Sequence, residues 1–113
     1  MSSTSSGALD GIRVLDFTRV LAGPYCTMSL GDLGAEIIKV ENPAGGDETR
    51  RFLPPDIDGE STYFLHVNRN KKSVVIDLSQ PAGKEVALEL AHGADVLVEN
   101  FRPGVMQRLG LDY

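Results

Sequence analysis

The chain has 113 residues, 42% of them hydrophobic and 24% charged, the composition of an ordinary soluble protein with one domain at most. A formal net charge of -5 excludes a general nucleic-acid binder, which needs a basic face to neutralise phosphates. A single cysteine, Cys26, excludes an intramolecular disulfide and a multi-cysteine metal site, and no apolar run approaches the ~18 residues of a membrane span. We therefore expect no nucleic acid, no membrane and no metal among its partners.

The chain begins with a Ser-rich segment, residues 1–8. This segment lacks the basic and apolar regions of a secretory signal and the arginines of a mitochondrial presequence. We predict a disordered tail at 1–8, a domain at 9–113 and a cytoplasmic protein.

The first forty residues predict a strand, a helix and a second strand. Residues 12–17 form a short β-branched and apolar run, which is a strand signal. A helix is predicted from Pro24 to Leu33, with proline at its first position and Gly34 just past its end. The run 37–40 is again short and β-branched, as expected for a strand.

The rest of the chain continues this alternation after a long loop. Residues 42–59 are rich in Gly, Pro and Asp and predict a loop of functional length, whereas 61–67 fits either a short helix or an extended piece. The further predicted elements are a strand at 73–78, a helix that starts at 79 or 80 and ends before Gly93, a strand at 95–98 and a helical start at 105–109.

Strands that alternate with helices predict an α/β fold with a mostly parallel sheet and flanking helices, because parallel neighbours need long return connections. A parallel sheet of four strands is normally covered on both faces by more chain. We therefore predict that the sequence is a fragment of a larger domain.

Ligands of open α/β sheets bind at the carboxyl ends of the strands, which here are 16–24, 41–50, 77–80 and 99–104. In the first of these turns, the small Ala22 and Gly23 either let a ligand approach the amides of a helix start or simply permit a tight connection. Neither a G-x-G-x-x-G motif nor a phosphate-binding P-loop occurs in the chain.

Isolated Asp, Cys and His residues have structural roles more often than catalytic ones. Asp16 is predicted to be a hydrogen-bond acceptor at a strand end, and Cys26 a small buried residue rather than a catalytic thiol. His66 and His92 are too isolated to suggest a metal pair.

Two groups of residues remain open to either interpretation. One group is basic and either meets a phosphorylated ligand or forms a solvated charged turn: Arg50, Arg51, Arg69, Lys71 and Lys72. Asn100 and Phe101 either contact and stack on a nucleobase or close a turn whose Phe fills the core.

Four blocks in order carry a family resemblance. They are GIRVLDFTRVLAGPYCTMSLGDLGAEIIKVE at 11–41, GDETR at 46–50, YF at 63–64 with NRNKKS at 68–73, and VENFRPG at 98–104. The stretch 9–113 thus resembles the family III CoA transferases (the CaiB/BaiF proteins), which include formyl-CoA and carnitine-linked enzymes and the α-methylacyl-CoA racemases.

The resemblance also separates branches of this superfamily. Racemases typically have a shorter connection before the Lys-Lys-Ser block, whereas this chain keeps a longer loop with GDETR and STYF. The stretches TRVLAGP and VNRNKKS look most like the succinate or glutarate-type dicarboxylate CoA transferases.

The resemblance implies an interlocked homodimer with a Rossmann-like large domain, acting on acyl-CoA and a small carboxylic acid. In this family, a catalytic aspartate forms an acyl anhydride and then an aspartyl-CoA thioester. That residue is expected beyond Tyr113, so the chain itself is expected to hold no catalytic residue and to be inactive alone. Asp16 and Asp77 do not match its position.

Matching positions imply a set of CoA-binding residues. The set is Leu21, Ala22, Asn42, Ile76, Asp77, Leu78, Ser79, Asn100, Phe101, Arg102 and Arg108. Formyl-CoA transferases carry Arg in place of Asn42, Lys in place of Ser79 and Gln in place of Leu21. Arg19 or Arg102 could supply the missing positive charge.

Two other functions remain open from the sequence. One is the racemase-like branch, and the other is a stand-alone α/β module that binds CoA or a nucleotide without catalysis.

Overall fold

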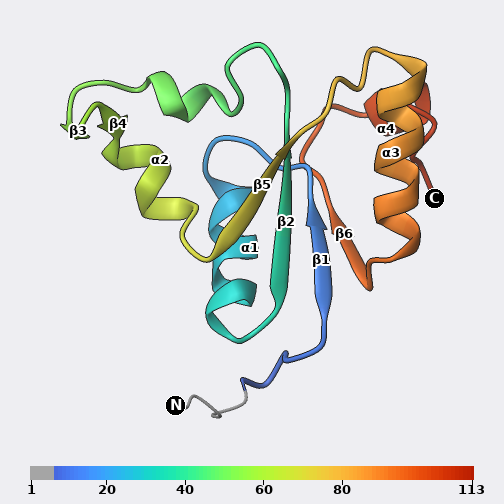
Figure 1. The fold of residues 1–113 in the computed structure, drawn as a ribbon, viewed down its shortest axis with the longest axis horizontal. Helices are drawn as coiled ribbons and strands as arrows, with labels where there is room; N and C mark the ends of the chain where they lie inside the picture. Colours follow the sequence, from blue (N-terminus) through green and yellow to red (C-terminus); the bar gives the residue numbers. More distant parts are fainter. Residues whose placement is uncertain (1–6) are drawn as a thin grey trace.

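A parallel sheet of four strands forms the centre of the computed structural model, which describes residues 7–113 (Figure 1). The strand order is β5-β2-β1-β6, with β1 at Arg13–Asp16, β2 at Glu36–Glu41, β5 at Lys71–Val75 and β6 at Val96–Val98. The helices are α1 (Ala22–Asp32), α2 (Thr62–Val67), α3 (Pro81–His92) and α4 (Val105–Arg108). The long loop between β2 and α2 holds a 3-10 turn, η1 (Glu48–Arg51), and a minimal hairpin of β3 (Asp56–Ile57) and β4 (Glu60–Ser61). The predicted α/β fold with a parallel sheet is therefore confirmed.

All four strands of the sheet run in the same direction, so their carboxyl ends lie at one edge. Asp16 of β1 is opposite Lys39 of β2 on one side and Val98 of β6 on the other. Glu41, the last residue of β2, is opposite Val75 of β5. The register thus gathers several charged side chains at the edge where ligands of such sheets bind.

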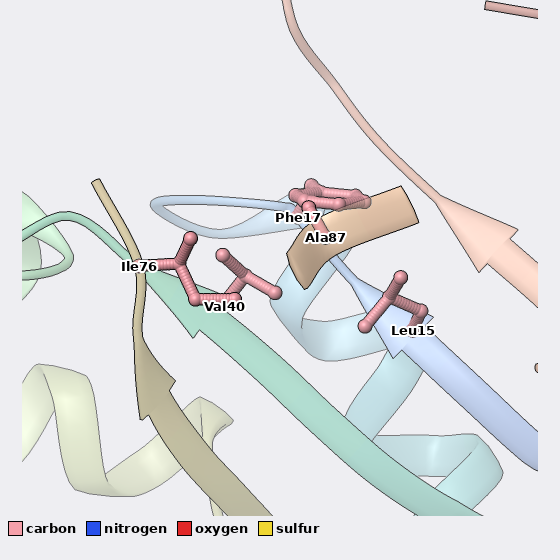
Figure 2. Packing of buried hydrophobic residues seen from close by; sticks show 5 residues of the cluster. All are labelled: Leu15, Phe17, Val40, Ile76 and Ala87. Carbon is pink, nitrogen blue, oxygen red and sulfur yellow. The ribbon is translucent and has the colours of Figure 1, made fainter. Parts of the chain in front are cut away.

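Alternate residues of the strands face opposite sides of the sheet and build two cores. Leu15, Phe17, Val40 and Ile76 pack with Ala87 of α3 (Figure 2). Val14 and Ile37 point the other way and pack with Ala35 and with Leu30 of α1. The same alternation places Asp16, Lys39 and Glu41 on the face of Val14 and Ile37, where buried charges then need partners.

The predicted boundaries hold with some shifts. Helix α1 begins at Ala22, so Pro24 is its third residue and not its first. The third strand of the central sheet, β5, covers 71–75 rather than 73–78, and the prediction of its position is wrong at both ends. Its first residue, Lys71, belongs to the basic group for which the sequence leaves a phosphorylated ligand and a solvated turn as alternatives, and its ammonium is buried against Asp16. The strand ends before Asp77, whose carbonyl accepts a hydrogen bond from Gln80 in the turn to α3.

Residues 61–67, for which the sequence left two possibilities, contain a helix. Ser61 caps α2 by accepting a hydrogen bond from the amide of Phe64 (3.3 Å). Helix α3 ends before Gly93, as predicted, and starts at Pro81, one residue after the later of the two predicted starts, with Gln80 as its N-cap.

Most of the predicted tail, residues 1–6, lies outside the described residues. Gly7 and Ala8 belong to a turn in which the Gly7 carbonyl accepts a hydrogen bond from the Asp10 amide (3.2 Å). Across residues 7–113, none of the helices combines the length and apolar character that a bilayer crossing requires.

Candidate functional site

A cleft of about 320 Å³ opens at the carboxyl edge of the sheet. Its walls come from the segments that follow the strands: Phe17 and Arg19 after β1, Asn42 after β2, Ile76 and Leu78 after β5, Phe101 and Arg102 after β6, and Arg108 of α4. A mixed apolar and polar cleft at this edge is the usual place for a ligand in an open parallel sheet.

A first buried charge pair joins β5 to β1 beneath this edge. The ammonium of Lys71 lies 3.1 Å from Asp16 Oδ2 and also donates to the Pro24 carbonyl (3.0 Å). Asp16 additionally accepts hydrogen bonds from the hydroxyls of Thr18 and Thr27. Burial lowers the pKa of Lys71, and the charge of Asp16 opposes this effect. Asp16 is therefore the strand-end acceptor that the sequence predicts, and its oxygens are committed to the fold.

A second buried pair joins β2 to the long loop. Lys39 and Asp47 are 1% and 0% exposed in their side chains, with Nζ and Oδ2 2.9 Å apart. Asp47 also accepts hydrogen bonds from the amide (3.0 Å) and hydroxyl (2.8 Å) of Thr49. Burial raises the pKa of Asp47, but the hydrogen bonds from Thr49 and Lys39 outweigh it, so the pKa lies below its usual value. Sequence reasoning missed this pair because a Lys inside an apolar strand gives no sign of its partner.

A third charge cluster surrounds Glu41 at the end of β2. Arg50 binds both of its oxygens, at 2.8 and 2.7 Å, and the amide of Asp47 donates to it at 2.9 Å. Burial raises the pKa of Glu41, but the hydrogen bonds from these donors and from the Ser73 hydroxyl lower it by a larger amount, so that the pKa falls to about 2. Glu41 is therefore an ionised structural carboxylate that ties the long loop to the sheet.

The two interpretations of the basic residues are resolved by these and similar pairs. Arg50, Lys71, Arg69 and Lys72 each lie within 4 Å of a carboxylate of the chain, with Asp32 and Glu36 as partners of the last two. Arg51 donates weakly to the Gly45 carbonyl (3.4 Å). These positions therefore give no support to the alternative in which the group meets a phosphorylated ligand.

Three other arginines line the cleft without a carboxylate partner among residues 7–113. These are Arg19, Arg102 and Arg108, whereas the acidic lining residues Glu41 and Asp47 are neutralised by Arg50 and Lys39. A locally positive cleft in an acidic protein suits an anionic ligand.

The structure brings six of the eleven predicted CoA-binding residues to this cleft. They are Asn42, Ile76, Leu78, Phe101, Arg102 and Arg108. Phe101 packs at the core, where its ring lies 6.3 Å from that of Phe17, and it also lines the cleft.

The other five lie at its border or elsewhere. Ser79 donates its amide and hydroxyl to Asp77 in the turn before α3. Asn100 is bound to the backbone of Arg19. Leu21, next to Ala22 at the start of α1, lines a separate hollow with Tyr63 and His66.

Gly23 in the first turn serves packing. A Cβ atom at Gly23 would overlap the side chain of Thr18, so the tight connection explains this glycine. Cys26 is exposed on α1, and the prediction of a buried residue is wrong because Thr27 and Met28 are the positions that face inward. No group of three or more His, Cys, Asp or Glu side chains within 7–113 is arranged to hold a metal ion.

Comparison with known proteins gives one consistent family. A family model described as CoA-transferase family III matches residues 9–113. The chain is 57% identical over 105 residues to the succinyl-CoA:glutarate CoA-transferase of Mus musculus, covering 93% of this chain and 24% of that protein. It is 51% identical over 106 residues to the formyl-CoA:oxalate CoA-transferase of Rhodopseudomonas palustris (strain BisA53), covering 94% and 25%.

Solved structures agree with this match. A CAIB/BAIF family protein from Brucella suis superimposes with a TM-score of 0.90 at 42% identity, over 96% of this chain and 30% of that one. A hypothetical protein from Mycobacterium tuberculosis gives a TM-score of 0.86 at 52% identity, over 95% and 29%. The chain spans about a quarter of the length of the curated relatives it matches.

Proposed function

We propose that this chain, which belongs to CoA-transferase family III, forms the CoA-binding amino-terminal part of an enzyme that moves CoA between carboxylic acids. The match of the family model to residues 9–113 confirms the family resemblance of the sequence.

The single observation that carries the proposal is the cleft with three arginines that have no acidic partner among the described residues. CoA has a 3′-phosphate, a 5′-diphosphate and an adenine ring. Arginines recognise phosphate oxygens through charge-assisted hydrogen bonds, and the exposed side of an aromatic ring stacks on a base. Arg102 and Arg108 supply the first feature, and Phe101 supplies the second.

The nucleophile of the reaction is expected beyond Tyr113. Both carboxylates that line the cleft are held in ion pairs, and Asp16 and Asp77 accept hydrogen bonds from residues of their own turns. A carboxylate that attacks an acyl-CoA must be free to form an anhydride and then an aspartyl-CoA thioester. The cleft carboxylates of this chain do not meet that need.

The similarity of this chain to two named transferases supports a dicarboxylate as the acceptor of CoA. The mouse relative is named as acting between succinyl-CoA and glutarate, and a human protein of the same name is 55% identical over 105 residues. We propose succinyl-CoA as donor and a short dicarboxylate as acceptor.

We also propose that the full-length protein is a cytoplasmic homodimer.

A transfer assay with the full-length protein tests this function. Succinyl-CoA and glutarate should yield glutaryl-CoA, and hydroxylamine should trap an activated enzyme carboxylate and stop turnover. Exchange of the proton at the acyl α-carbon without CoA transfer would instead identify the racemase-like branch. Saturable CoA binding with neither reaction would identify a binding module.

A further inference from the structure

Arg19 stands out in the cleft because both polar groups of its backbone are hydrogen-bonded to one side chain, that of Asn100. Its amide donates to Asn100 Oδ1 (3.1 Å), and its carbonyl accepts from Asn100 Nδ2 (2.9 Å). The side-chain amide of Asn100, in the loop after β6, thus forms the same two hydrogen bonds to Arg19 that the backbone of a neighbouring strand would form.

The residues on either side of Arg19 are held by the buried pair described above. Lys39 donates to the Thr18 carbonyl at 3.0 Å, while both oxygens of Asp47 lie 3.4 Å from the Val20 amide. Three consecutive residues are therefore fixed by side chains of β2, the long loop and the β6 loop. We call Lys39, Asp47 and Asn100 the backbone clamp.

The clamp holds the chain in a conformation that it would otherwise avoid. Val20 has φ = 75°, in the left-handed region that β-branched residues rarely adopt. Such strain persists only where the surroundings impose it, and it occurs most often at functional sites. Here the constrained backbone includes Arg19, the residue just before Val20.

The side chain of Arg19 extends from this fixed backbone into the cleft. Its guanidinium carbon lies 5.5 Å from the centre of the Phe101 ring, and the described residues provide no carboxylate within 4 Å of it. A pre-positioned guanidinium loses less conformational entropy when it binds an oxyanion.

We infer that Arg19 is a phosphate-binding residue of the cleft and that the backbone clamp positions it. This inference rests on the proposed CoA-binding function and adds a residue to it. The side chains of Asn42 and Ser79 are neutral and bound within the chain, since Asn42 closes the 42–46 turn and Ser79 binds Asp77. Arg19 would therefore supply positive charge that these two residues do not.

Calorimetric titration of the full-length protein with CoA and with dephospho-CoA, which lacks the 3′-phosphate, tests the inference. Arg19→Gln should weaken CoA binding about tenfold to hundredfold, as for other charge-assisted contacts. Arg19→Lys, which keeps the charge but loses the planar fork, should fall between Arg19→Gln and the unaltered protein. Arg51→Gln is the matched control, because Arg51 is exposed and lies outside the cleft lining.

The two ligands identify the phosphate. If Arg19 binds the 3′-phosphate, Arg19→Gln should weaken the binding of CoA and leave the binding of dephospho-CoA unchanged. If Arg19 binds the diphosphate, the binding of both ligands should weaken equally. Either result supports the inference.

The clamp is tested with Asn100→Ala. This change should weaken CoA binding, and combining it with Arg19→Gln should cost much less than the product of the two separate effects, because both act through one guanidinium. Fully independent effects would overturn the positioning role of Asn100.

Failure of the inference is distinguishable from failure of the proposed function. Unchanged CoA affinity in Arg19→Gln, together with weakened binding in Arg102→Gln, would overturn the inference and leave the CoA site standing. Absence of CoA binding by the unaltered protein would overturn both.

Discussion

Lys39 and Asp47 form an ion pair that is closed off from solvent, with Nζ and Oδ2 2.9 Å apart, although one lies inside a strand and the other in a long loop. The pair connects two parts of the site, because Lys39 also binds the Thr18 carbonyl and Asp47 the Val20 amide. Its loss should therefore affect both stability and the shape of the cleft.

We expect Asp47→Asn to lower the free energy of unfolding of the full-length protein by about 3 to 5 kcal/mol, because it leaves the Lys39 ammonium buried without its counter-charge. Urea unfolding followed by circular dichroism measures this. Asp58→Asn is the matched control, since Asp58 is exposed at a loop tip with φ = 51°, a conformation that Asn tolerates. Equal stability of the two variants would contradict a structural role for the pair.

Glu41 should make stability depend on acid pH. Its pKa is about 2 in the folded protein and 4.5 is its ordinary value, so the ionised form is favoured by folding. The contribution, about 3 kcal/mol, is fully present above pH 4.5 and is lost as the pH falls towards 2.

The measurement is the free energy of unfolding of the full-length protein from pH 7 to pH 3, compared with that of Glu41→Gln. The variant should be less stable at pH 7 and should lose less stability on acidification. Glu48→Gln, at an exposed glutamate of the same loop, should follow the unaltered protein. Parallel curves for Glu41→Gln and the unaltered protein would refute the assignment.

Gly23→Ala should destabilise the protein although alanine favours helices more than glycine does. A Cβ at this position of α1 overlaps Thr18, whose hydroxyl and amide bind Asp16. The expected loss is roughly 1 to 3 kcal/mol, as for other overpacked sites. The measurement is the change in melting temperature, which should be a decrease. An increase would contradict the overlap, because at an unobstructed helical site the same substitution stabilises a protein by about 1 kcal/mol.

Arg102→Ala and Arg108→Ala should each weaken CoA binding to the full-length protein by roughly 1 to 3 kcal/mol. Calorimetry at two salt concentrations measures both the affinity and its electrostatic part, which should decrease in each variant. Lys84→Ala on α3, which lies outside the cleft lining, serves as the control. Affinity unchanged in both arginine variants would remove them from the site.

Much of the fold could be predicted because its signals are local. The β-branched runs around Leu15 and Ile38 mark strands, and Pro81 and Gly93 delimit α3 from its own ends. The errors occurred where a local signal competes with a distant partner. From the sequence, Lys71 fits either a solvated turn or a phosphate contact, yet it begins β5 and its charge is buried against Asp16, 55 residues earlier.

The sequence by itself therefore determined the alternation of strands and helices, the family, and the edge of the sheet where a ligand would bind. Only the tertiary structure decided which charges are free. Arg50, Lys71 and Lys39 are neutralised by carboxylates that the sheet and the long loop bring to them, whereas Arg19, Arg102 and Arg108 remain facing the cleft. The physical reason is that ion pairing depends on distances of a few ångströms between residues far apart in the chain, which no local pattern encodes.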